Sequence, residues 1–378
     1  MSVQPKFRPT VKSEFSRVLR ERVNGYFKEK GISTHANAEM VVKTIVLITA
    51  WFGTYGLLVF GNVPLWASYV LWAVLGAVIA LVSMNIGHDA IHGAYSKKKW
   101  VKDLLSHAFN INGASAYMWK ISHNHAHHTF TNIHGHDEDI SPGDILRISP
   151  STKLLPMHRF QQFYAFFFYG LATLSWVLMK DYKQFFENRI NNYDNHKHPA
   201  REYFLLFFYK LVNYGLYIAL PIIFMPYTVG QIVLGYLLFH FVCGMYLALM
   251  FMLAHAVEEV HFPLPDDEGI IGDDWVVHQM HTTANFSSSS WWAGFLSGGL
   301  NTQIEHHLFA NICSVHYRSI SKVIKATCEE YGVPYHDIPS FGAALKSHFN
   351  FLKRMGREAD YRPKTKRQTP AEVKLAHA

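Results

Sequence analysis

Charged residues are scarce in this 378-residue sequence: Asp, Glu, Lys and Arg together make up 17%, whereas hydrophobic residues make up 49%. This balance is unlike that of an ordinary soluble domain and favours a membrane protein. Cysteine is also rare, and the three cysteines, Cys243, Cys313 and Cys328, form no CxxC pair. Neither a disulfide framework nor a cysteine-bound zinc or iron–sulfur centre is therefore predicted.

The first 40 residues lack the apolar core of a signal peptide, so we expect this segment to remain in the cytoplasm. Within it, apolar residues recur at helical spacing opposite basic residues, at Phe15, Val18, Leu19, Val23, Tyr26 and Phe27. The pattern predicts an amphipathic helix that either lies on the membrane or docks on the cytosolic part of the protein.

Four stretches are apolar over about 20 residues, the length that a helix needs to cross a bilayer core of roughly 30 Å. They are residues 41–60, 65–86, 204–224 and 229–254. The short connections 61–64 and 225–228 contain no Lys or Arg, whereas the other connecting segments are rich in both. Because positive residues favour the cytoplasmic side, we expect two helical hairpins with their tight turns outside and both termini inside.

A fifth stretch, residues 160–179, is uncharged and could also pass as a span. If it crossed the membrane, the histidines that follow it would face the opposite side from those that precede it. We therefore interpret it as an interfacial or buried cytoplasmic helix. The expected organisation is an N-terminal amphipathic segment (1–40), a membrane domain (41–340) and a basic C-terminal helix and tail (341–378).

Histidine is unusually common, with 24 residues against 28 for Asp and Glu together, and imidazole is the commonest protein metal ligand. His88 and His92 lie four residues apart, so both imidazoles can share one face of a helix. His123 and His127 repeat this spacing, and His128 lies about 100° further round an α-helix. Adjacent histidines of this kind suit two metal ions better than one.

A third cluster ends in His306 and His307, with Gln303 one helical turn before His307. His255 follows the fourth apolar stretch and His88 follows the second. Both stretches are expected to end on the cytoplasmic side, so His255 can lie beside the other clusters. Together these residues predict a metal site on the cytoplasmic face of the membrane. His125 is expected to be structural or in the outer shell, and no metal role is assigned to His240 or His281.

Metal-bound histidines usually donate their second ring nitrogen to a carboxylate, a carbonyl or water. Six carboxylates lie close enough in sequence to accept such bonds, or are ordinary solvated acids: Asp89, Asp137, Asp139, Glu258, Glu259 and Glu305. His134 and His136 lie in a loop-like run and are expected in the outer shell or at the surface.

The order and spacing of these clusters resemble the histidine boxes of the membrane fatty acid desaturase superfamily. Residues 87–92 resemble the first box, residues 119–132 the second and residues 301–309 the third. Gln303 replaces the first histidine of the third box, as in the front-end branch, which inserts a double bond between an existing one and the carboxyl end. The likeness runs from the first apolar stretch to about residue 340.

This resemblance implies an all-α integral membrane protein, in which four spans and a helical cytoplasmic cap hold a di-iron site. Two non-haem iron ions would be held by His88, His92, His123, His127, His128, His255, His306 and His307, with Gln303 near or in the shell. O₂ and two electrons would be co-substrates, and the acyl substrate would be carried by CoA, an acyl carrier protein or a lipid. Spacing alone does not name iron, since imidazole also suits zinc, copper and nickel.

Two departures from the family pattern affect these expectations. Many eukaryotic front-end enzymes carry a fused cytochrome b5 domain, but no His-Pro-Gly-Gly haem motif occurs here. Electrons are therefore expected from a separate donor of the ferredoxin or cytochrome b5 type. Relatives also place an asparagine one turn before the histidine that His255 matches, whereas Phe251 stands here.

Membrane lipid is the expected surrounding, and no nucleic-acid partner is expected.

An unactivated methylene offers no acidic proton, so a metal–oxygen oxidant must remove its hydrogens. Trp291, Trp292, Gly298 and Gly299 could line the acyl channel or simply pack. A hydroxylase of the same superfamily is the nearest alternative, because the same oxidant can place oxygen on the substrate. A histidine-rich metal transporter is the alternative from another class, but it would bind metal near the bilayer midplane, where only His240 is expected.

Overall fold

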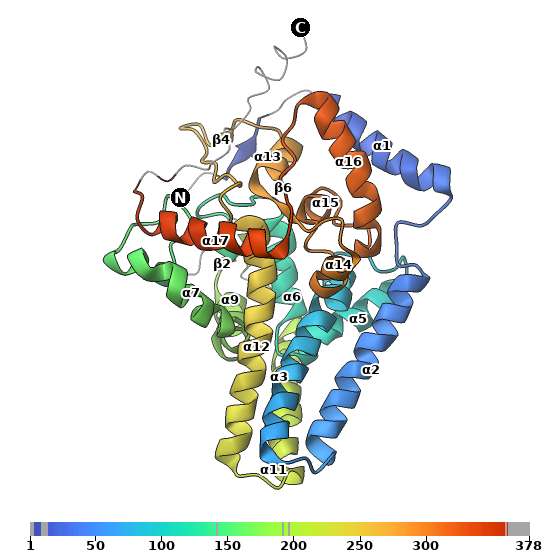
Figure 1. The fold of residues 1–378 in the computed structure, drawn as a ribbon, viewed down its shortest axis with the longest axis vertical. Helices are drawn as coiled ribbons and strands as arrows, with labels where there is room; N and C mark the ends of the chain where they lie inside the picture. Colours follow the sequence, from blue (N-terminus) through green and yellow to red (C-terminus); the bar gives the residue numbers. More distant parts are fainter. Residues whose placement is uncertain are drawn as a thin grey trace. The chain divides into compact units, whose positions relative to one another are not determined.

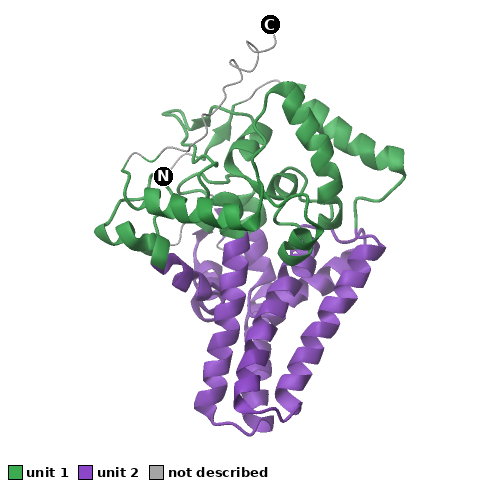
Figure 2. Ribbon diagram, in the orientation of Figure 1, with its two compact units in different colours: residues 1–35, 122–163, 251–378 green, residues 36–121, 164–250 purple. Residues whose placement is uncertain are grey.

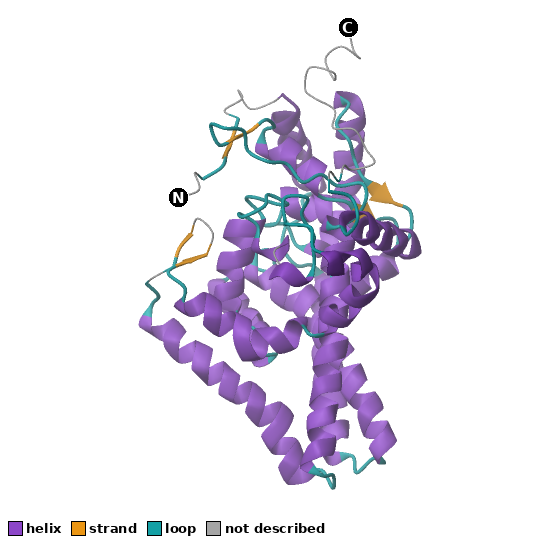
Figure 3. Ribbon diagram, turned by 90° about the vertical axis from the view of Figure 1, so that its left-hand side faces the viewer, coloured by secondary structure: helices purple, strands orange, loops and turns teal. Residues whose placement is uncertain are grey.

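The computed structural model describes residues 4–8, 14–140, 143–190, 193–195, 197–359 and 361. It divides into two compact units (Figure 2): unit 1 comprises residues 1–35, 122–163 and 251–378, and unit 2 comprises residues 36–121 and 164–250. The described residues are mostly helical, and their strands form three short pairs (Figure 3). Most of the expected C-terminal tail, residues 362–378, lies outside the described part.

Unit 2 contains most of the long apolar helices. Its elements are α2 (Ala38–Phe60), α3 (Leu65–Val82), η1 (Ser83–Gly87), α4 (His88–Ile91), α5 (Lys99–Ile111), α6 (Ala116–Trp119), α8 (Ala172–Ser175), η6 (Trp176–Lys180), α9 (Asp181–Phe186), β2 (Arg189–Ile190), β3 (Tyr193–Asp194), α10 (Ala200–Tyr214), η7 (Gly215–Ala219) and α11 (Leu220–Phe224). Three helices continue along the chain from one unit into the other: η2 (Lys120–His127), α7 (Gln161–Gly170) and α12 (Val229–His255).

Four helices are long and apolar enough to cross a membrane, and they correspond to the four expected spans. They are Ala38–Phe60, Leu65–Ile91, Ala200–Phe224 and Val229–His255. The 27 residues of α12 give it a length of about 40 Å. The fifth apolar stretch, which we interpreted as an interfacial or buried helix, lies in the helical pair Pro156–Gly170 and Ala172–Phe186. The two helices together are long and apolar enough to cross a membrane, but they bend by 54° at the break between them.

Local signals set the ends of the first hairpin. The side chain of Asn37 accepts a hydrogen bond from the amide of Met40, which caps the start of α2. Gly61 ends that helix, and Pro64 immediately precedes α3. Because Pro lacks an amide hydrogen and its ring fixes φ, it suits a helix start. The short connection makes α2 and α3 neighbours that run side by side (Figure 1).

Small residues allow α3 and α12 to approach each other closely. A Cβ atom at Gly76 of α3 would overlap the backbone carbonyl of Phe239 on α12, and one at Gly235 would overlap the indole of Trp72. Close backbone contact of this kind is a common way for membrane helices to associate, because lipid gives little hydrophobic drive to helix pairing.

Replacing Gly76 with Val should therefore destabilise the protein. The added side chain meets backbone atoms that cannot rotate away, and overpacking of this kind costs about 1–3 kcal/mol or more. We expect a lower melting temperature in detergent, measured by intrinsic tryptophan fluorescence.

Gly53 of α2 provides the matched control, because a Cβ atom there would meet nothing within 4 Å. Gly53→Val should leave the melting temperature nearly unchanged. Equal melting temperatures for the two variants would contradict the close contact at Gly76.

Unit 1 consists of shorter helices and loops. Its elements are β1 (Lys6–Phe7), α1 (Glu14–Lys30), η3 (Glu138–Ile140), η4 (Gly143–Ile145), η5 (Pro156–Phe160), β4 (Ile270–Ile271), α13 (Trp275–Thr282), β5 (Asn285–Phe286), α14 (Trp291–Ser297), α15 (Gln303–Leu308), η8 (Ser314–His316), α16 (Tyr317–Tyr331), β6 (Asp337–Ile338) and α17 (Phe341–Met355). The strand pairs β1–β4 and β5–β6 are parallel, with Lys6 opposite Ile270 and Asn285 opposite Asp337, whereas β2–β3 in unit 2 is antiparallel.

The apolar face of α1 packs on α16. Its buried residues Phe15, Leu19, Val23 and Phe27 form one cluster with buried residues of α13, α15 and α16. The two helices lie side by side (Figure 1) and run in opposite directions, since the ring of Phe15 lies near that of Tyr331 and the ring of Phe27 near that of His316. The amphipathic pattern found in the sequence is therefore covered by protein.

Candidate metal centre

His123 and His127 of the second box lie on η2, which is wound as a π-helix, and His128 follows it directly. The amide of His128 donates to the carbonyl of His123 at 3.0 Å, a bond from residue i+5 to residue i. The α-helical spacing expected from the sequence is therefore wrong here. A π-helical turn contains more residues than an α-helical one, so His123 and His128 are one turn apart, with ring centroids separated by 4.8 Å.

Two further helices deliver the remaining histidines of unit 1. Helix α12 ends on His255, and α15 carries His306 and His307. The start of α15 is held by Asn285, whose side-chain oxygen accepts from the amide of Ile304 at 2.9 Å. Asn285 also donates to the buried carboxylate of Glu305 at 2.8 Å. These bonds fix the turn from which both histidines project.

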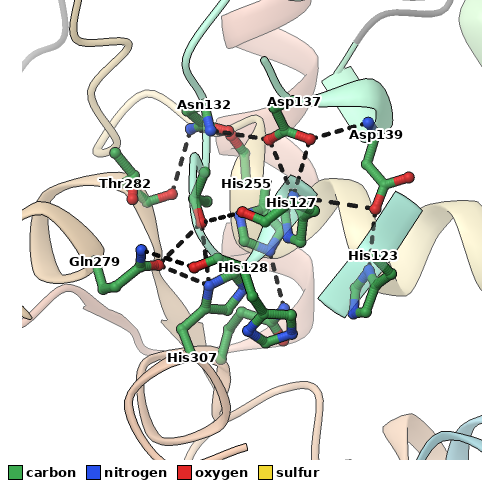
Figure 4. Close-up of polar contacts among 12 residues, drawn as sticks. His123, His127, His128, Asn132, Asp137, Asp139, His255, Gln279, Thr282 and His307 are labelled. Carbon is green, nitrogen blue, oxygen red and sulfur yellow. Dashed lines mark hydrogen bonds and ion pairs between the residues drawn. The ribbon is translucent and has the colours of Figure 1, made fainter. Parts of the chain in front are cut away.

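Five of these histidines form two trios that share one member. His127, His255 and His307 place one nitrogen each within 4.8 Å of one another, and His128, His306 and His307 do the same. A third group combines His123 and His127 with Asp139. All of these imidazoles are buried, and His307 belongs to both trios. Figure 4 shows the rings converging from separate segments of the chain.

Each trio is supported by hydrogen bonds to the Nδ1 atoms of its rings. Asp137 bonds His127 at 2.9 Å, Gln279 bonds His307 at 2.8 Å and Tyr317 bonds His306 at 3.2 Å. Asp139 bonds His123 Nδ1 in the same way at 3.0 Å. Such partners fix the tautomer and the ring orientation of a metal ligand. Asp137 and Asp139, two of the six carboxylates expected as partners, are therefore confirmed as hydrogen-bond partners of histidine rings.

The electrostatic environment differs between the imidazoles of the site. Burial lowers the pKa of His307 well below its ordinary value, and the neighbouring imidazoles lower it further, which favours the neutral form of this ring. Burial also opposes the charged form of His127, but Asp137 outweighs that effect and raises its pKa. The Nε2 atoms of His127 and His307 have no hydrogen-bond partner among the described residues. Buried polar atoms of this kind call for a partner, and a metal ion fits both.

Gln279 of α13 is a site residue that the sequence did not indicate. Its side-chain oxygen lies 2.8 Å from His307 Nδ1 and accepts from Thr131 at 2.9 Å, while its amide donates to the carbonyl of His128 at 3.2 Å (Figure 4). A single glutamine outside any histidine pattern carries no spacing signal. Its position beside His307 follows from the packing of α13 against α15, two helices that are separate in the sequence.

Replacing Gln279 with Ala should lower metal affinity or activity by about 10–100-fold, the range typical of an outer-shell partner. The change removes the acceptor that fixes the tautomer of His307, and it leaves the ligands themselves in place. Metal content after dialysis against a graded chelator series would measure the effect. Gln279→Glu retains an acceptor oxygen and should keep more metal than Gln279→Ala; the reverse order would contradict this role.

Gln303 and Phe251 border the first trio. The side-chain nitrogen of Gln303 lies 2.9 Å from His255 Nε2, and its oxygen is buried without a hydrogen-bond partner among the described residues. Phe251 stands one turn before His255, with its ring centroid 4.7 Å from that of His255 and 5.1 Å from that of His127. An apolar ring here shields the imidazoles where an asparagine would offer a polar group.

The histidines of the first box lie together in unit 2. His88 and His92 follow the π-helical turn η1, and their ring centroids are 4.6 Å apart. The indole of Trp119 packs edge-on against both rings. Asp89 lies 3.8 Å from His88 Nδ1, which is longer than a hydrogen bond.

The histidines that were not expected to bind metal directly lie outside the two trios. His125 and His134 are exposed, whereas His136 is buried. His240 bonds Thr173 in unit 2, and His281 bonds Asp273 in unit 1.

The remaining expected carboxylates have structural partners. Glu259 bonds Ser347, and Glu258 pairs with Arg354. Tyr335 donates to Glu305 at 2.8 Å, in addition to the bond from Asn285.

The residues before the third box divide into exposed and packed groups. Trp291 and Trp292 of α14 are exposed. Gly298 and Gly299 have positive φ angles, and a Cβ atom at Gly299 would crowd Ser314 and Tyr317. The two glycines therefore form a tight turn beside α16.

Long apolar helices and buried imidazole trios together indicate a class of protein, the membrane proteins with histidine clusters able to hold metal ions. Comparison with known proteins narrows this class. The chain matches the model of the Fatty acid desaturase family over residues 64–339. It belongs to that family and is a fatty acid desaturase.

Individual relatives agree with this assignment. The chain is 35% identical to the sn-1 linoleoyl-lipid 6-desaturase of Synechocystis sp., over 92% of this chain and 97% of the relative. It is 33% identical to the acyl-lipid (8-3)-desaturase of Physcomitrium patens, over 91% of this chain and 72% of the relative. It is also 33% identical to the sn-1 linoleoyl-lipid 6-desaturase of Arthrospira platensis, over 90% of this chain and 92% of the relative.

Proposed function

We propose that this desaturase is a front-end enzyme that inserts a cis double bond into the acyl chain of a membrane lipid, using a di-iron centre, O₂ and an external electron donor. The observation that carries the proposal is the pair of imidazole trios joined at His307 in a chain of this family. Gln303 in the third box and relatives described as linoleoyl-lipid 6- and acyl-lipid (8-3)-desaturases favour the front-end position and the lipid carrier.

The reaction balances with two external electrons. The substrate –CH₂–CH₂–, O₂, two electrons and two protons give –CH=CH– and two molecules of water. A bound di-iron centre supplies the oxidant that removes the two hydrogens, since no side chain can abstract them from an unactivated carbon. The protein's part is to orient the chain and to exclude water.

The proposed ligands combine the three boxes and His255. Unit 1 contributes His123, His127, His128, His255, His306 and His307, with Gln303 in or near the shell. By the order of boxes that the family shares, His88 and His92 of unit 2 complete the set. Asp137, Asp139, Gln279 and Tyr317 would hold the rings through Nδ1.

The topology follows from the charges flanking the four helices. The connections 61–64 and 225–228 contain no Lys or Arg, so we place both on the outer side and the histidines on the cytoplasmic side. A soluble reductant of the ferredoxin or cytochrome b5 type would then reach the site from the cytoplasm.

Expression with defined fatty acids tests the proposal. The chain would be produced aerobically in cells fed saturated, mono-unsaturated and di-unsaturated fatty acids, with His306→Ala as control. Gas chromatography–mass spectrometry of total lipids then reads the mass change. Loss of two hydrogens on the carboxyl side of an existing double bond, absent from the control, is the expected result.

Other outcomes distinguish the alternatives. Gain of one oxygen would identify a hydroxylase of the same superfamily. Iron counting on purified protein separates a missing donor from a wrong function: about two iron ions per chain with no product points to the donor, whereas none overturns the di-iron proposal.

A further inference from the structure

We infer that the basic end of the α1–α16 pair is the docking surface for a small acidic electron-carrier protein, and that Tyr317 connects this surface to the metal site. The inference rests on the proposed function, because only an enzyme that reduces O₂ needs the two electrons. Each encounter would deliver one electron, so the donor is oxidised twice for every O₂ consumed.

The surface is defined by five exposed basic residues at one end and along one side of the pair. Arg318, Lys322 and Lys325 follow one another at i, i+4 and i+7 on α16, a spacing that places them on one face of the helix. Lys28 and Lys30 end α1, which runs antiparallel to α16 and brings its last turn beside η8. We call these five residues the basic surface.

Charge along the pair is segregated. The other end of α16 carries Glu329 and Glu330, and Glu330 is held by Arg22 of α1 at 2.6 Å. Glu29 is the one acid within the C-terminal turn of α1. No ion pair involves Arg318, Lys322 or Lys325 among the described residues. Unpaired charge of one sign attracts a partner of the opposite sign and speeds its association.

A short path leads from the basic surface to the metal site. Tyr317, next to Arg318 in the chain, is 1% exposed, and its hydroxyl lies 3.2 Å from His306 Nδ1. His306 belongs to the second imidazole trio. One buried side chain thus separates an exposed cationic residue from a proposed ligand. An anionic lipid surface could also be attracted by the basic residues, but it would have no use for this connection.

The test measures binding of the full-length protein in detergent to a plant-type [2Fe–2S] ferredoxin at low ionic strength. The variant Arg318→Glu/Lys322→Glu reverses two charges of the basic surface. The matched control, Lys346→Glu/Lys353→Glu, reverses two exposed charges on α17 of the same unit. We expect the Kd to rise at least tenfold for the first variant and less than twofold for the control, with equal melting temperatures.

Three outcomes would overturn the inference. They are equal weakening by both variants, absence of ferredoxin binding by the unmodified protein, and loss of binding only to vesicles rich in phosphatidylglycerol, which would assign the surface to lipid. A chemical reductant separates this inference from the proposed function. If dithionite with a mediator supports desaturation by Arg318→Glu/Lys322→Glu while ferredoxin does not, the docking surface is supported. If the unmodified protein forms no desaturated lipid even with the chemical reductant, the proposed function fails on its own.

Discussion

Replacing His307 with Ala should abolish desaturation and strip metal from the protein. His307 contributes to both imidazole trios, so its loss leaves each with two histidines. We expect product formation to fall by more than the roughly 100-fold that marks the upper range for an outer-shell partner. Lipid analysis of expressing cells and metal counting on purified protein would measure the two effects.

His125 supplies the matched control for this experiment. It has the same side chain, lies on the same helix η2 as His127, and is exposed. It belongs to neither trio, so His125→Ala should retain product and metal within about twofold. Full metal content in His307→Ala would show that His307 is not a ligand, and a loss in His125→Ala as severe as that in His307→Ala would show that the effect is not specific to the trios.

The second large effect is expected at a buried ion pair in unit 2. The ammonium of Lys210 lies 2.7 Å from Asp181, which also accepts from the amide of Ser115 at 2.7 Å, and Lys210 further donates to the carbonyls of Gly113 and Trp176. Lys210→Met would leave the carboxylate of Asp181 buried without its cation. Breaking such a pair costs about 3–5 kcal/mol, which corresponds to a fall in melting temperature on the order of 5–10 °C.

Two further variants make this prediction specific. Lys99→Met removes the lysine of an exposed pair with Asp103 on α5, and it should change the melting temperature little, because exposed pairs contribute little. Combining Lys210→Met with Asp181→Leu removes both buried charges and should restore much of the lost stability. A melting temperature for Lys210→Met no lower than that for Lys99→Met would refute the prediction.

The sequence predicted what depends on composition and on separation along the chain. Runs of about 20 apolar residues predicted the four long helices. Paired histidines predicted the three segments that correspond to the histidine boxes. The carboxylates Asp137 and Asp139 were expected as partners because they follow the second box within about ten residues. These features are local, so hydrophobic length and spacing express them directly.

The rest of the site depends on contacts between distant segments. Gln279 and Tyr317 reach His307 and His306 from α13 and α16, and neither belongs to a pattern that spacing can reveal. The amphipathic pattern of α1 was equally compatible with a membrane surface and with a protein surface. Its packing against α16 is a tertiary choice, since an apolar face has no built-in preference for what covers it.

The π-helical winding of η2 was also beyond the sequence. Hydrophobic periodicity distinguishes helix from strand, but it does not separate the α from the π hydrogen-bond pattern over one or two turns. The bond from His128 to His123 is the feature that places both residues one turn apart. π-Helical turns are rare and often occur at functional sites.

That winding has an evolutionary consequence. The extra residue of a π-helical turn is matched by its wider winding, so deleting one residue from the segment Lys120–His127 would require either α-helical winding there or a turn of about 100° in every later side chain of the helix. Surface loops of the same chain can gain or lose residues with little effect, but here a single-codon deletion would change either the winding of the segment or the directions of His127 and His128. We therefore expect related sequences to differ in this segment by substitutions and to keep its length constant.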